Sequence, residues 1–156
     1  MTQPSDEDLA TLMRSRAGTA FITALGGEIV EASEGKVLMR LPYSGKLVGN
    51  PDTGVLHGGA ITAMLDHACG MAVGTGLGVI ITEAAARQST SYATLDLRVD
   101  YMKAATPEAD VWVAGECVKI TRQIVFARAR AYQDSPDDPI ATATGTFITT
   151  VTRPGS

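Results

Sequence analysis

Apolar positions along the chain repeat with two different periods, and these periods predict the order of helices and strands. The first segment, residues 5–25, has the spacing of an amphipathic helix and ends at Gly26-Gly27, a pair that can stop a helix. Two short strands, Glu28–Ser33 and Lys36–Leu41, are predicted to follow as a hairpin. Residues 42–56 are rich in Gly, Pro, Asn and Asp, so we expect a loop there.

A second helix, about residues 58–73, and four strands are predicted for the rest of the chain. Residues 74–89 fit a continuation of that helix, a short extra helix or a flexible lid. The strands have turn residues between them and cover 90–104, 109–121, 123–134 and 140–152. Short turns between successive strands predict antiparallel pairing and a four-stranded meander. One face of the first strand should be wet, because apolar and charged residues alternate there, with Leu95, Leu97, Val99 and Tyr101 against Asp96, Arg98 and Asp100.

The helix at 58–73 is apolar on nearly every side. Its one carboxylate is Asp66, eight residues after Gly58. A helix without a polar stripe is expected to be buried all round. The simplest arrangement that buries it is a curved antiparallel sheet wrapped around the helix, which places the chain in the α+β class.

Composition narrows the class of protein. A chain of 156 residues with 45% hydrophobic content fits one domain, 1–156, with its core at about 28–152. The net charge is -4 and no Lys/Arg cluster is present, which argues against nucleic acid or an anionic membrane as partner. The N-terminus lacks a basic segment followed by an apolar run, and Cys69 and Cys117 lack metal-type spacing. We therefore expect a reduced, cytoplasmic protein.

One loop-helix segment carries a family resemblance. It contains Asn50, the run Leu56-His57-Gly58-Gly59-Ala60 and Asp66, and it is followed by the segment Thr94–Met102 of the strand predicted at 90–104. These residues resemble the signature of PaaI-like acyl-CoA thioesterases, which belong to the 4-hydroxybenzoyl-CoA thioesterase superfamily and have the hot-dog fold. The resemblance spans roughly residues 28–150. It implies hydrolysis of acyl- or aryl-CoA thioesters by a homodimer or a dimer of dimers, without a metal and without a cofactor besides the coenzyme A of the substrate.

Thioester hydrolysis needs a donor for the oxyanion and a group that activates water or attacks the carbonyl. A helix N-terminus offers free N–H groups, and glycine lets a carbonyl approach them closely. The Gly58 N–H is therefore the candidate oxyanion donor, as the resemblance also implies, with the Asn50 amide nearby. Asp66 is the candidate base or nucleophile, and the residues leave these two roles open.

The distance between the two groups predicts the assembly. A rise of about 1.5 Å per residue separates Gly58 from Asp66 by roughly 12 Å along the helix. Groups that act on one carbonyl must lie within about 3–4 Å of it. Two antiparallel central helices could meet this condition, so each site should combine Gly58 and Asn50 of one subunit with Asp66 of the other.

The resemblance also implies roles for two further site residues. Thr94 matches a family position at which a hydroxyl, in many members that of Ser, orients the water or the carboxylate. His57 matches the histidine before the glycines, with a positional role towards the thiol. Cations are needed for the phosphates of coenzyme A, and the nearest candidates by topology are Lys103, Arg122 and Arg98.

Purely structural roles stay open for several of these residues. Asp66 could be a solvated helix acid, His57 a loop histidine, and the glycine pair a packing feature. Cys69 is better explained as a small buried side chain than as a nucleophile, because no basic partner is evident. Two other functions compete on the same fold: a non-catalytic acyl-CoA-binding module, and a hydroxyacyl dehydratase, whose His-Phe-Pro pattern this chain lacks.

Overall fold

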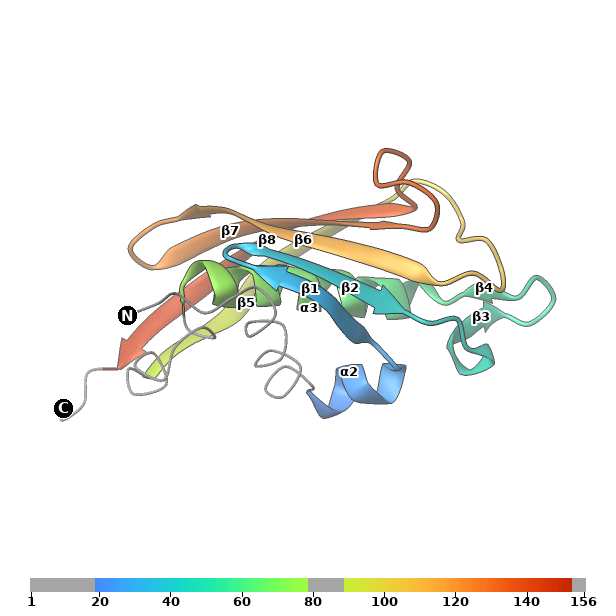
Figure 1. Cartoon of the computed structure of the whole chain (residues 1–156), viewed down its shortest axis with the longest axis horizontal. Helices are drawn as coiled ribbons and strands as arrows, with labels where there is room; N and C mark the ends of the chain where they lie inside the picture. Colours follow the sequence, from blue (N-terminus) through green and yellow to red (C-terminus); the bar gives the residue numbers. More distant parts are fainter. Residues whose placement is uncertain (1–18, 79–88, 153–156) are drawn as a thin grey trace.

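A long antiparallel sheet covers one central helix in the computed structural model, which describes residues 19–78 and 89–152 (Figure 1). The elements are, in chain order, α2 (Ala20–Leu25), β1 (Glu28–Ser33), β2 (Lys36–Leu41), the 3-10 turn η1 (Gly45–Leu47), β3 (Val48–Asn50), β4 (Val55–Leu56), α3 (Gly58–Gly76), β5 (Ser89–Tyr101), β6 (Val111–Ile120), β7 (Ile124–Tyr132) and β8 (Ala141–Thr152). This is the hot-dog arrangement that the sequence predicted.

The N-terminal part of the prediction is confirmed where it can be compared. Helix α2 begins after Thr19, whose side chain accepts a hydrogen bond from the Ile22 N–H, and it ends at Gly26 in the left-handed conformation. The predicted hairpin has the predicted bounds, with β1 and β2 paired antiparallel. The first part of the helix predicted at 5–25 lies outside the described residues, and the described helix is short.

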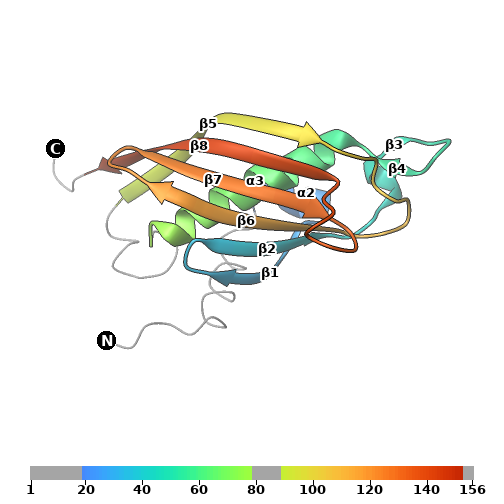
Figure 2. The same cartoon turned by 90° about the horizontal axis from the view of Figure 1, so that it is seen from above.

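The predicted four-stranded meander is wrong for β5. The sheet order is β1-β2-β6-β7-β8-β5, so β5 pairs with β8 and not with β6 (Figure 2). The connection at 102–110 crosses the ends of two strands: the Met102 N–H donates to the Ile140 carbonyl before β8, and the Gln133 side chain after β7 bonds to Thr106. A connection of this length can span three strand spacings of about 4.8 Å, and a tight hairpin turn cannot.

Helix α3 lies against the inner face of this sheet. Its contacting side is apolar except for Thr75 and includes Met64, Leu65, Ala68 and Ala72, none of which is exposed. The helix continues to Gly76, three residues beyond its predicted end, which resolves the start of the ambiguous stretch at 74–89; residues 79–88 of that stretch lie outside the described residues.

The expectation that α3 is buried all round is wrong for the single chain. One stripe of the helix keeps partial exposure, at helical spacings, and consists of Gly59, Thr62, Ala63, Asp66, His67 and Gly70. Two members of this stripe contact β5, the last strand of the sheet, since Asp66 is bonded to Thr94 and Thr62 to Tyr101. No helix among the described residues is long and apolar enough to cross a membrane.

Candidate active site

The first turn of α3 leaves one backbone donor unused. The His57 N–H donates to the Leu47 carbonyl (2.7 Å), the Gly59 N–H to His57 Nδ1 (2.8 Å) and the Ala60 N–H to the His57 carbonyl (3.0 Å). Between them, the Gly58 N–H forms no hydrogen bond with any group in residues 19–78 and 89–152. A free N–H at the positive end of a helix is a donor site for an anionic oxygen.

His57 acts as the N-cap of α3. Its Nδ1 accepts a hydrogen bond, so the proton of the neutral imidazole is on Nε2. This geometry requires glycine on both sides, since a Cβ at Gly59 would lie 2.8 Å from Nδ1 and one at Gly49 would lie 2.9 Å from the His57 Cα. The histidine therefore holds the helix start, in agreement with a positional role.

Asp66 and Thr94 lie together, although they are far apart in the sequence. The Thr94 hydroxyl donates to Asp66 Oδ1 at 3.0 Å. Cys69 is next to this carboxylate: burial, and then the charge of Asp66, raise the pKa of its thiol to about 12. Cys69 is therefore a neutral, buried thiol near neutral pH and is not a nucleophile.

A β-bulge in β5 turns Thr94 toward the helix. Thr94 pairs with Phe147 and Asp96 pairs with Thr146, which leaves Leu95 as the extra residue. The predicted alternation places Leu95 on the apolar face, together with Leu97, Val99 and Tyr101. In the structure, Leu95 is 56% exposed and Thr94 instead contacts Asp66. The bulge shifts the phase of the strand by one residue, which local alternation cannot show.

Two residues of the site were not predicted from the sequence. The Tyr101 hydroxyl donates to the Gly58 carbonyl (2.5 Å), and it lies 2.5 Å from the Thr62 hydroxyl. Thr62 could have been found from spacing alone, because it lies four residues after Gly58 and four before Asp66 and so shares their helix face. Tyr101 has no comparable local signal.

The other predicted residues have partners elsewhere in the described chain. Asn50, the last residue of β3, is exposed, and its side-chain oxygen accepts the Asp52 N–H. Lys103 forms an ion pair with Asp138, and Arg98 forms one with Asp100.

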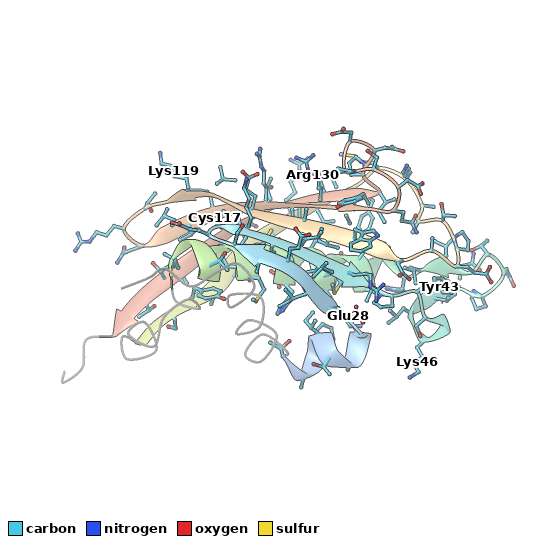
Figure 3. The ribbon with its side chains drawn as sticks, in the orientation of Figure 1. Glu28, Tyr43, Lys46, Cys117, Lys119 and Arg130 are labelled. Carbon is cyan, nitrogen blue, oxygen red and sulfur yellow. The ribbon has the colours of Figure 1, made fainter. Side chains whose placement is uncertain are left out.

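The three predicted cations do not form one cluster. Arg98 lies within β5, Lys103 follows β5, and Arg122 lies in the β6–β7 turn at the other end of the sheet. Lys119, near that turn, and Arg130 point away from α3, whereas Tyr43 and Lys46 lie at the end where α3 begins (Figure 3). In the described part of the chain, no three His, Cys, Asp or Glu side chains are grouped as a metal site.

Comparisons with known proteins agree with this fold. Residues 53–140 match the profile of the Thioesterase superfamily, and the chain belongs to that family. A Pseudomonas aeruginosa protein of known crystal structure is 38% identical, with a TM-score of 0.73 over 90% of this chain and 98% of its own. A Halobacterium salinarum protein, provisionally named an esterase, is 29% identical over 94% of this chain and 96% of its own length.

The resemblance to PaaI proteins is also confirmed at the level of fold. The phenylacetic acid degradation protein PaaI of Thermus thermophilus, in the structure of a mutant form, superposes with a TM-score of 0.69. It is 22% identical, over 83% of this chain and 98% of its own. The family supports thioester hydrolysis as the general class of reaction.

Proposed function

We propose that this protein hydrolyses acyl- or aryl-CoA thioesters to the free acid and coenzyme A. The observation that carries the proposal is the unused Gly58 N–H at the start of α3, on the same helix face as the Asp66 carboxylate. One group would stabilise the oxyanion, and the other would activate water or attack the carbonyl. A coenzyme A substrate agrees with the cytoplasmic location predicted from the sequence, which stays a prediction.

Each active site would be shared between two subunits. Gly58 and Asp66 are separated by roughly 12 Å along the helix, too far to act on one carbonyl. Two features support a partner on this side: the partly exposed stripe of α3, and the outer edge of β5, which pairs only with β8 among the described strands. An antiparallel second copy would place Asp66 of the partner subunit near Gly58, and two-fold symmetry would create two such sites. A further association of two dimers stays a prediction from the family resemblance.

The proposed reaction can follow two routes, which differ in the role of the Asp66 carboxylate. As a base, Asp66 takes a proton from water while the water oxygen attacks the thioester carbon, and the Gly58 N–H stabilises the oxyanion. Collapse of this intermediate breaks the C–S bond, and the thiolate of coenzyme A takes up a proton. As a nucleophile, the Asp66 carboxylate displaces the thiolate and water then hydrolyses the anhydride. Rapid-quench mass spectrometry separates these roles, because only the second adds the mass of the acyl group to the chain.

Asp66→Asn is the direct test of this proposal. Release of the coenzyme A thiol is measured with a panel of acyl- and aryl-CoAs. General acid–base catalysis contributes roughly 10²–10⁴-fold, so kcat of the variant should fall by that factor. Asp96→Asn is the matched control, since Asp96 is an exposed carboxylate on the same strand as Thr94 and should be dispensable. A wild-type rate in Asp66→Asn would refute the mechanism, and binding without turnover in the wild type would favour an acyl-CoA-binding module.

The shared site has an independent test. Sedimentation should give a dimer or a larger assembly. Asp66→Asn chains are mixed with chains that carry a substitution only at Gly58. The heterodimer should regain activity, because one of its two sites then combines an intact Gly58 with an intact Asp66. A monomer that is fully active would contradict the shared site.

A further inference from the structure

The peptide between Gly58 and Gly59 is held from both sides. Its N–H is bound by His57 Nδ1 (2.8 Å), and its carbonyl is bound by the Tyr101 hydroxyl (2.5 Å). Two successive glycines have the largest backbone freedom of any residue pair, and helix ends fray. The Gly58 N–H belongs to the preceding peptide, whose His57 carbonyl accepts the Ala60 N–H. The Gly58 Cα joins the two peptides, so the bonds to the Gly58–Gly59 peptide restrict the φ and ψ of Gly58 and with them the direction of its N–H.

Tyr101 provides this restraint from another element of the fold. A phenol has one proton, and Tyr101 donates it to the Gly58 carbonyl, so the Thr62 hydroxyl is the donor in its contact with Tyr101. The phenol oxygen is thereby bonded on both sides. The ring also lies close to Gly58, where a Cβ would be 3.1 Å from the hydroxyl oxygen.

The bulge at Leu95 allows one strand to contact both groups of the proposed chemistry. Thr94 and Tyr101 are seven residues apart, and in a regular strand an odd separation places side chains on opposite faces. The extra residue restores a common face: Thr94 pairs with Phe147 and Tyr101 pairs with Ala141, both buried on the inner side. Strand β5 therefore reaches Asp66 through Thr94 and Gly58 through Tyr101.

We propose that Tyr101 is a positioning residue that fixes the direction of the Gly58 N–H, and that Thr62 orients the Tyr101 hydroxyl. This inference rests on the proposed function, because it assigns a role in the same reaction. Tyr101 acts through the helix backbone and not on the substrate. Its loss should therefore lower kcat more than it raises KM.

Tyr101→Phe removes the hydroxyl and keeps the ring. Loss of one such hydrogen bond should lower kcat by about threefold to tenfold, with little change in KM. Thr62→Val should lower kcat by a smaller factor, and Thr62→Ser, which keeps the hydroxyl, should have the wild-type kcat. The double variant should be no slower than Tyr101→Phe alone, because Thr62 acts through that hydroxyl. Tyr132→Phe is the control, since Tyr132 follows the buried Ala131 in β7 and so faces away from α3.

A second measurement does not depend on turnover. The amide resonances of Gly58 and Gly59 in ¹H–¹⁵N spectra should shift in Tyr101→Phe and stay in place in Tyr132→Phe. Unchanged resonances, or an unchanged kcat in a folded Tyr101→Phe, would overturn the assignment. If the wild type hydrolyses no thioester and the Gly58 and Gly59 resonances still shift in Tyr101→Phe, the proposed function is refuted. The restraint of the Gly58–Gly59 peptide by Tyr101 would then still hold. If Tyr101→Phe fails to fold, Thr62→Val supplies both measurements.

Discussion

Helix α3 lies close against Gly115 of β6, and this contact predicts the effect of a single methyl group. A Cβ at Gly115 would lie 2.4 Å from the Ala68 carbonyl oxygen and 2.8 Å from its carbon, where ordinary contact begins at 3.4 Å. Gly115 pairs with Val37 on one side and with Ala129 on the other, so the strand cannot move away alone. In Gly115→Ala, the helix and the sheet must separate by about 1 Å against native packing density.

Two opposing effects decide how much Gly115→Ala lowers the free energy of unfolding. Overpacking of this kind costs about 1–3 kcal/mol, and here backbone atoms of two paired elements must move, which favours the upper end. Alanine also restricts the unfolded chain, which returns about 0.4–1 kcal/mol. We expect a net loss of about 2 kcal/mol, or roughly 4–8 °C in Tm for a chain of this size.

The assay is urea and thermal denaturation at one fixed protein concentration, because assembly would make Tm depend on concentration. The urea midpoint should fall with an unchanged m value. Gly45→Ala is the matched control, since a Cβ there meets no atom within 4 Å, and its Tm should stay or rise slightly. Equal Tm values for Gly115→Ala and the wild type would refute the reasoning that this close approach requires glycine.

Two further predictions concern stability. Thr75 is fully buried and its hydroxyl accepts the Gly35 N–H (3.1 Å). Thr75→Val should therefore lower the free energy of unfolding, measured by urea denaturation, by about 1–3 kcal/mol, and Thr75→Ser should lower it less. Equal losses in the two variants would contradict a role for the hydroxyl. The raised pKa of Cys69 means that the native state keeps its proton from pH 9 to about 12 while the unfolded state loses it. The free energy of unfolding should therefore fall by up to about 1.4 kcal/mol per pH unit above pH 9, more steeply than in Cys69→Ala, and parallel pH profiles would contradict this.

Local sequence patterns determined most of the elements of this protein. The hairpin of β1 and β2, the long apolar helix, and the strands β6 to β8 follow from periodicity and turn residues, since these depend on near neighbours in the chain. The motif from His57 to Asp66 likewise identified the helix start and the acid. Spacing alone also placed the two groups too far apart for one chain, which is why the sequence predicts a shared site.

The tertiary structure decided where β5 lies and which way its residues face. Pairing with β8 depends on the path of residues 102–110 over distant strand ends, and no local period records such a path. The bulge takes Leu95 out of the predicted alternation and allows Thr94 and Tyr101 to reach Asp66 and Gly58 from one strand. Alternation reports facing only while a strand stays regular, and one inserted residue changes the phase of everything before it.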